Sequence, residues 1–446
     1  MNATQASLLS PYQPPDGSWT RRDASHLLWR AQHGASTHDI DRAHSEGLGA
    51  TLDRLLTTQG ETPEFQASEA LLRKVAEQSG NIEDLKAWWA YRLLKSANPL
   101  VEKMTLFWHN HFATSNAKVR SSEQMAAQNR LFREHALLNF RDLVHEIARD
   151  VAMLVWLDSN ANRNRSPNEN FARELMELFS LGVGNYTEKD IQEAARAFTG
   201  WHVREGAFWF NPIQHDTREK NVLGRSGNLD GKDVVELCLE QPAAARFLAD
   251  KLLRVFVMPQ PQKDSVEVLA ECIRSNNFAM RPVLRQLLGS TLFFSAEARA
   301  SIIKSPADLV LGALRALEGK PNLQSAVRLM AKLGQDLFEP PTVKGWEGGR
   351  LWINSASMLV RANFAAELAT GDELGAIAEP ESLSRERGWT GAADGVAYYT
   401  QLLLARDMPS ARDMIVERLR QTNVSLSTQL RSAIYLLMTM PEFQMI

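Results

Sequence analysis

The spacing of apolar residues predicts a chain built mainly of amphipathic α-helices. Leucine, alanine and aromatic residues recur every three to four positions through most of residues 21–199 and 232–446, which is the period of a helix with one face toward a core. Only residues 202–212 come near to alternation, with Glu205 and Gly206 placed for a turn. The expected fold class is therefore mainly α: a multi-helix globular bundle with one small β-hairpin.

The segment 166–201 carries the clearest signals for the starts of helices. Ser166 and Glu169 have the spacing of a capping box, and Pro167 stands where the missing N–H of proline costs nothing. A helix is therefore expected to begin at Pro167, and Thr187 marks the start of a second one. Together the two should form a helical hairpin.

Polar residues line one side of the first of these helices. Asn170, Glu174 and Glu177 are spaced i, i+4 and i+7, so they form one stripe in which two carboxylates can point the same way. Carboxylates one turn apart on bundle helices commonly hold metal ions. The alternative is that Glu169–Arg173 and Arg173–Glu177 are ordinary ion pairs on a solvated face, each contributing roughly 0.2–0.5 kcal/mol.

Two histidines form a second group with ligand chemistry. His109 and His111 stand two residues apart in the aromatic segment FWHNHF, residues 107–112. Such a pair can bind one metal ion if the backbone is extended, whereas on a continuous α-helix the side chains point about 200° apart. The alternative is a pair of core histidines, each hydrogen-bonded to a backbone carbonyl.

The loop after the expected β-hairpin holds three further polar candidates. His215 and Asp216 are adjacent within residues 213–231, and Lys220 follows as a candidate for substrate binding. A His–Asp pair can supply a metal ligand and a carboxylate that orients it, or an acid/base pair. Asp216 can equally serve a local turn.

Two other loops are candidates for substrate binding, because loops often carry binding groups. Residues 158–168 are rich in Asn and Arg, and Arg163 and Arg165 suit an anionic substrate, although a solvated loop is the common alternative. Residues 338–350 combine a Pro–Pro turn with a glycine-containing loop that carries Trp346. This tryptophan is expected to line a cleft.

Composition and charge argue against several classes of protein. The 50 basic and 53 acidic side chains leave a formal net charge of −3, so a nucleic-acid partner is not expected. No apolar run approaches the roughly 18 residues of a spanning helix, and membrane insertion is not expected. Cys238 and Cys272 are far apart, which suggests neither a disulfide framework nor a cysteine metal site.

The organisation expected along the chain is a leader followed by one domain. Residues 1–20 form the Pro-rich leader and residues 21–446 the domain, with a site-bearing half, 21–231, and a helical scaffold half, 232–446. The leader lacks the basic and then apolar pattern of an export signal. The chain is therefore expected to be soluble and cytoplasmic.

Four motifs resemble those of a known bacterial family. They are FWHNHF at 107–112, NENFARELMELFSLGVGNYTEKDIQEAARAFTGW at 168–201, HD followed by K and LG at 215–224, and PPTVKGWEGGRLWINSASMLVRANF at 340–364. These motifs closely resemble the family named domain of unknown function 1800, over nearly the whole chain. That family has no settled biochemical role, so the resemblance points to a site more than to a reaction.

The resemblance also has implications for partner and compartment. Family members are often encoded beside a sulfatase-like protein of another uncharacterised family, and many carry export signals. This chain lacks such a signal, so periplasmic residence would require co-export with a partner. Members often have a histidine where this chain has Phe179, and that position therefore cannot be an obligatory ligand here.

The coincidence of these motifs with ligand-type residues favours a metal-dependent enzyme, most simply a hydrolase, with an oxidoreductase as the alternative reaction. The expected cofactor is a divalent zinc, manganese or iron ion. The nitrogen ligands would be His109, His111 and His215, the carboxylate ligands or general base Glu174 and Glu177, and the orienting carboxylate Asp216.

The rival hypothesis is a non-catalytic helical binding protein that acts as a partner of the sulfatase-like protein. On this view the histidines and the Glu/Arg stripe form a buried polar network, and an exposed Trp346 with residues 338–350 makes the contact surface. The two hypotheses differ in geometry. Metal ligands converge within about 2.0–2.3 Å of one point, whereas histidines in a network bond to backbone carbonyls.

Overall fold

Helices form nearly all of the regular structure. A computed structural model describes residues 8–319, 321–370, 380–406 and 408–446. Up to residue 200 the helices are α2 (Arg21–Ala31), α3 (Thr37–Leu56), α4 (Pro63–Ser79), α5 (Ile82–Lys95), α6 (Pro99–His111), α7 (Asn116–Val119), α8 (Ser122–Glu134), α9 (Phe140–Ile147), α10 (Val151–Trp156), α11 (Asn170–Glu174) and α12 (Glu188–Ala197). A π-helical turn, η2 (Leu175–Ser180), directly continues α11.

The rest of the chain is helical as well. Its helices are α13 (Gly231–Glu240), α14 (Pro242–Phe256), α15 (Lys263–Ser275), α16 (Met280–Leu288), α17 (Pro306–Ala316), α18 (Leu323–Lys332), α19 (Ser355–Thr370), α20 (Pro380–Glu386), α21 (Ala392–Leu404), α22 (Pro409–Arg420) and α23 (Leu426–Thr439). Short 3₁₀ turns occur at η1 (Ser159–Ala161), η3 (Pro212–Gln214), η4 (Gly349–Trp352) and η5 (Pro441–Gln444). The expected mainly α-helical fold class is confirmed.

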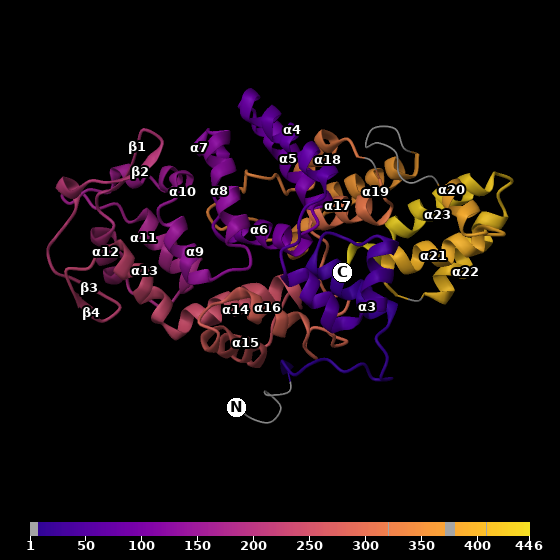
Figure 1. Cartoon of the computed structure of the whole chain (residues 1–446), viewed down its shortest axis with the longest axis horizontal. Helices are drawn as coiled ribbons and strands as arrows, with labels where there is room; N and C mark the ends of the chain where they lie inside the picture. Colours follow the sequence, from indigo (N-terminus) through magenta and orange to yellow (C-terminus); the bar gives the residue numbers. More distant parts are fainter. Residues whose placement is uncertain (1–7, 320, 371–379, 407) are drawn as a thin grey trace.

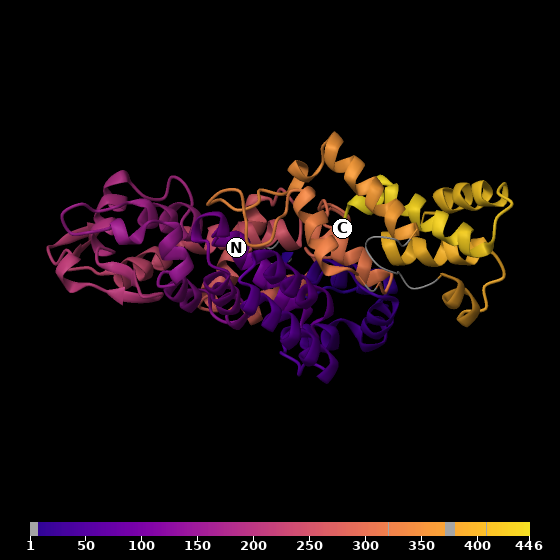
Figure 2. The same cartoon turned by 90° about the horizontal axis from the view of Figure 1, so that it is seen from above.

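The helices are arranged along one long direction. In Figure 1, α9–α13 lie near one end, α20–α23 lie at the other, and helices from both halves of the sequence fill the middle. Figure 2 shows the same order from above. The middle therefore joins segments that are far apart in the sequence.

Two predictions about the segment 166–210 are confirmed. Helix α12 begins with a capping box at Thr187, whose side chain accepts the N–H of the third helical residue. The strands β1 (Trp201–Arg204) and β2 (Ala207–Phe210) then pair antiparallel. Glu205 and Gly206 join them with φ of 53° and 75°, the left-handed conformation of a tight hairpin turn.

A second, smaller hairpin follows that the sequence pattern did not predict. Strands β3 (Lys220–Val222) and β4 (Arg225–Gly227) pair antiparallel around Leu223 and Gly224, which both have positive φ. Each strand is only three residues long, so neither shows a recognisable alternation of apolar and polar residues. The expectation of a single hairpin is therefore corrected to two.

The helix expected to begin at Pro167 begins later. The backbone N–H of Ser166 donates to the carbonyl of Arg163 at 2.9 Å, and α11 starts only at Asn170. The side-chain oxygen of Asn162 accepts the N–H of Asn168 at 3.0 Å and so holds the intervening residues in a turn. The predicted capping box at Ser166 is therefore wrong, because a side chain from the preceding loop takes over the role of organising this segment.

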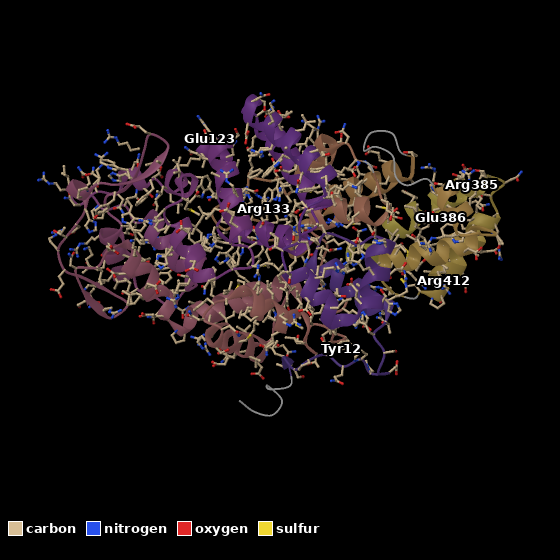
Figure 3. All side chains as sticks on the ribbon, in the orientation of Figure 1. Tyr12, Glu123, Arg133, Arg385, Glu386 and Arg412 are labelled. Carbon is tan, nitrogen blue, oxygen red and sulfur yellow. The ribbon has the colours of Figure 1, made fainter. Side chains whose placement is uncertain are left out.

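The described part of the predicted leader, residues 8–20, packs against the body of the protein. Leu9 is buried, and the N–H of Tyr12 donates to the carbonyl of Gly289 at 2.8 Å. The ring of Tyr12 stacks on Phe294 with 4.2 Å between the ring centroids. Tyr12 lies at the lower edge of the molecule in Figure 3.

A buried ion-pair network holds α6 in the middle of the molecule. Glu102 of α6 is fully buried and accepts hydrogen bonds from Arg133 of α8 at 2.7 and 3.0 Å. Arg92 of α5 donates to the same carboxylate at 3.0 Å. Figure 3 shows Arg133 at the centre of the view. Three helices are thus tied together by one carboxylate whose charge is fully paired.

The partly buried carboxylate of Asp150 accepts hydrogen bonds only from uncharged groups among the described residues. Asp150 caps α10 by accepting the N–H of Met153 at 2.8 Å, and it accepts a second hydrogen bond from the amide of Gln128 at 2.6 Å. Burial raises the pKa of Asp150 from its usual 3.8 to about 6. Folding therefore favours the protonated acid, and stability should fall as pH rises from about 4 to about 6.

Asp150→Asn is expected to raise the free energy of unfolding at pH 7 by roughly 1–3 kcal/mol, because it removes a buried charge and keeps a helix cap. At pH 4 the gain should nearly vanish. Urea unfolding across this pH range measures the difference. Asp230→Asn, at the capping box of α13, is the matched control, and an equal gain at both pH values would contradict the assignment.

Candidate functional site

Helix α6 places its two histidines on different sides. Pro99 occupies its first turn, and the helix continues without a break through His109 to His111. Both imidazoles are buried, and residues two apart on an α-helix point in nearly opposite directions. The Nε2 of His111 donates to the carbonyl of Phe179 in η2 at 2.9 Å. This is the carbonyl bond expected of a core histidine.

His109 lies in a cage of aromatic rings. The centroids of Trp89, Phe338 and Trp346 lie 5.4–5.6 Å from its imidazole centroid. Its Nε2 is buried and has no hydrogen-bond partner among the described residues. Burial lowers the pKa of His109 to about 3, so the ring is neutral. His109 and His111 therefore face separate surroundings.

Asn110, between the histidines, binds the loop that contains Trp346. Its side-chain oxygen accepts the N–H of Trp346 at 2.6 Å, and its amide donates to the carbonyl of the same residue at 3.2 Å. Gly345 has φ of 80°, and a Cβ there would lie 2.3 Å from the Asn110 oxygen. Only glycine allows this approach. Trp346 is consequently 6% exposed, which corrects the expectation of an exposed contact residue.

The two carboxylates of the α11–η2 helix have different surroundings. Glu174 is partly buried and has no hydrogen bond to a described residue, and burial followed by the charge of Glu177 raises its pKa. Glu177 accepts a hydrogen bond from the hydroxyl of Tyr186 at 3.0 Å. Burial and this carboxylate raise the pKa of Tyr186 to about 12. Glu177 is thus held in place by a neutral phenol.

One of the two ion pairs predicted for this helix is confirmed. Arg173 donates to Glu169 at 2.8 Å, which is the expected i, i+4 pair. Its second ion pair is with Glu188 of α12 at 2.8 Å, while Glu177 is bonded to Tyr186. Arg173 therefore links two helices instead of continuing the pairing along its own.

Asp216 is the acceptor in a dense cluster of arginines. The Arg218 and Arg196 side chains donate to its carboxylate at 2.6 and 2.9 Å. These hydrogen bonds, with that from Arg218 first, hold the pKa of Asp216 well below its usual range. The carboxylate is therefore ionised and occupied, and it does not orient the neighbouring histidine.

His215 and Lys220, on either side of this cluster, bond to backbone carbonyls. The Nδ1 of His215 donates to Thr199 at 2.8 Å, and the ammonium of Lys220 donates to Arg218 at 3.1 Å. Lys220 is buried, and burial lowers its pKa. Lys220 is therefore not presented to solvent as a substrate ligand, whereas His215 is partly exposed.

Arg163 and Arg165 remain exposed, as a solvated or substrate-binding loop requires. Arg163 donates to the carbonyl of Asn160 at 3.3 Å. Asn164 between them binds the carbonyls of Gln214 and Ile213 at 2.9 and 3.1 Å, one through its backbone and one through its side chain. The arginine loop is therefore fixed beside the segment that follows β2.

The predicted metal ligands do not come together. Across residues 8–319, 321–370, 380–406 and 408–446, no group of three or more His, Cys, Asp or Glu side chains is placed to hold a metal ion. His111 and His215 already donate to carbonyls, and Asp216 is paired with arginines. The donor set in this arrangement does not fit zinc, manganese or iron.

The sequence patterns did not indicate one cavity that has the character of a ligand-binding site. A cavity of about 600 Å³ lies where residues 12–29 meet residues 294–304, 403–406 and 445–446, and it is lined by basic and aromatic side chains. Its residues come from four distant segments and match no motif, so no local signal in the sequence could have revealed it.

These features define a mainly helical protein whose motif residues bond chiefly to one another. The chain belongs to the family described as protein of unknown function (DUF1800), whose profile matches residues 26–445. No curated protein and no solved structure matches the chain. In the described part of the chain, no helix is long and apolar enough to cross a bilayer.

Asn110→Ala is expected to lower the free energy of unfolding by about 1–3 kcal/mol, because two buried backbone groups of Trp346 lose their partner. The Trp346 amide should also exchange its hydrogen faster, as followed by mass spectrometry. Asn170→Ala, at an exposed position, is the control and should change stability by less than about 0.5 kcal/mol. Unchanged exchange at Trp346 would contradict the assigned docking role.

Proposed function

We propose that the chain is a helical binding protein that holds a protein partner, with no metal chemistry at its motifs. The proposal rests on the hydrogen bonds that the motif side chains make. Asn110, His111, His215 and Asp216 each bond to another part of the same chain. Their joint effect is to fix loops and helices, which leaves binding to a surface that these elements position.

The surface that we assign to this role is the hairpin patch, made of Arg163, Arg165, Trp209, Phe210 and Ile213. Ile213 is 81% exposed, Phe210 42% and Trp209 36%. Bulky apolar side chains next to arginines are the residue types that dominate binding at protein interfaces. The strands β1 and β2 that carry part of the patch lie near one end of the molecule (Figure 1).

One edge of the hairpin is closed and the other is open. The N–H and carbonyl of Val203 in β1 bond to the side chain of Asn160 at 2.7 and 3.1 Å. The N–H of Asn211 donates to the carbonyl of Gly200, so these two residues form a hydrogen-bonded pair. Hydrogen-bonded and non-hydrogen-bonded pairs alternate along antiparallel strands. The backbone N–H and carbonyl groups of Phe208 and Phe210 therefore point away from β1. An extended segment can therefore pair with β2.

The charged and apolar residues of the hairpin patch indicate which kind of partner it would bind. Arg163 and Arg165 favour an acidic surface, whereas Arg204, whose guanidinium lies 5.2 Å from the centre of the Trp209 ring, is paired with Glu205 at 3.5 Å. The occupant is thus an extended apolar segment flanked by acidic residues. The sulfatase-like protein that often accompanies this family is the partner that we propose to test first.

A metal-dependent hydrolase or oxidoreductase is the second candidate. The observation in its favour is Glu174, a partly buried carboxylate with a raised pKa and no hydrogen-bond partner among the described residues, directly before the π-helical turn η2. Such turns are frequent at functional sites. For this function His109 and His111 would have to leave their present surroundings.

The test of the proposal is the affinity of the purified chain for the sulfatase-like protein, measured by biolayer interferometry. Ile213→Glu and the double variant Arg163→Glu/Arg165→Glu should each weaken binding about tenfold or more, since they place a negative charge on the patch. Leu359→Glu, at a position 63% exposed on α19, is the matched control and should bind normally.

Two results would overturn this proposal. One is a parent chain that forms no complex at micromolar concentration. The other is a complex whose affinity is the same in all three variants, because the partner would then dock elsewhere.

A further inference from the structure

The cavity of about 600 Å³ near the N-terminal segment has the size of a small-molecule site. It lies between residues 12–29, which include part of the leader and most of α2, and residues 403–406 at the end of α21. Residues 294–304 and 445–446 complete its wall. Figure 3 places Tyr12, one of its lining residues, at the edge of the molecule. The hairpin patch contributes no residue to it.

Two basic side chains in this wall have buried donors without acceptors. Lys304 is 1% exposed, and its ammonium has no hydrogen-bond partner among the described residues. The ammonium lies 4.2 Å from the ring centre of Trp29 and 3.7 Å from that of Phe443. The Nη1 of Arg299 is likewise buried without a partner in the described part of the chain. Unsatisfied charged donors of this kind are costly to bury.

The charges around the cavity do not cancel. Arg22 and Arg406 also line it, so four basic residues face two acidic ones. Of the acidic residues, Asp23 already accepts hydrogen bonds from Arg299, Thr20 and Tyr12. The other, Asp16, is exposed. The lining residues therefore carry a surplus of positive charge, and the carboxylates of Asp308 and Glu442 lie near Lys304 and Arg406 outside the lining.

The remaining wall is apolar. Trp29, Phe294, Leu403 and Leu404 contribute rings and aliphatic side chains. We infer that the cavity binds a small organic anion, in which a carboxylate or phosphate group meets Lys304 and the arginines and an apolar or aromatic body meets these side chains. This inference is independent of the partner-binding function proposed above, because it rests on different residues.

A purely structural role for Lys304 explains less of what is seen. Two aromatic rings can stabilise a buried ammonium, but they leave its hydrogen-bond donors unused and do not account for the free Nη1 of Arg299 in the same wall. An anion in the cavity would interact with the positive charge to which both residues of this wall contribute.

The experiment is isothermal titration calorimetry of the full chain with 1-naphthyl phosphate, 1-naphthoate and the uncharged 1-naphthol. At least one anion should bind about tenfold more tightly than 1-naphthol. The comparison of phosphate with carboxylate identifies which acid group the site prefers. Equal affinity for 1-naphthol, or no binding of either anion at millimolar concentration, would overturn the inference.

Two variants assign the binding to this cavity. Lys304→Met keeps the length of the side chain and removes its charge, and Arg406→Gln removes a charge from a partly exposed position. Each should weaken anion binding at least fivefold and leave 1-naphthol unaffected. Lys232→Met, at an exposed position on α13, is the matched control. Anion binding that stays unchanged in both cavity variants would place the site elsewhere.

Thermal unfolding separates the two roles of Lys304. If the residue exists to bind an anion, Lys304→Met should leave the unfolding temperature equal or higher, since the unpaired charge is gone. A large fall in unfolding temperature, combined with unchanged binding in Arg406→Gln, would establish a structural role and refute the site.

Discussion

Helix α6 is buried on almost every side, and most of the polar side chains on it find a partner inside the protein. Glu102 meets Arg133, Lys103 meets Asp308 of α17, and the residues near the end of the helix bond to two other segments. These partners come from both halves of the chain. The position of α6 thus determines where η2, α17 and the 338–350 loop can lie.

This constraint also explains why the family motifs are rich in ligand-type residues without forming a metal site in this structure. A buried helix that must attach two distant loops needs side chains that donate or accept hydrogen bonds, and Asn110 and His111 do this. Phe179 accepts the hydrogen bond of His111 through its backbone carbonyl, and its ring lies 6.5 Å from the imidazole centroid. The bond therefore does not depend on the side chain at that position.

The fold was predictable where the apolar spacing extends over many residues. It was less predictable where a single side chain determines the start of an element. Apolar spacing was sufficient for the long helices, and the Glu205–Gly206 turn was sufficient for the first β-hairpin. The start of α11 depends on a hydrogen bond from the backbone N–H of Asn168 to the side chain of Asn162, which no local pattern shows. Residue types alone also suggested ligands, but not the partners that occupy Asp216 and bury Trp346.

As proposed above, the motif residues serve one another and not a metal ion. Elemental analysis of untagged protein, after incubation with zinc, manganese and iron(II) and removal of excess metal, can test this. The expected result is far less than one equivalent of any of these metals, with no difference between the parent and the double variant His109→Ala/Glu174→Ala. A stoichiometric metal in the parent that is lost in a folded double variant would contradict it.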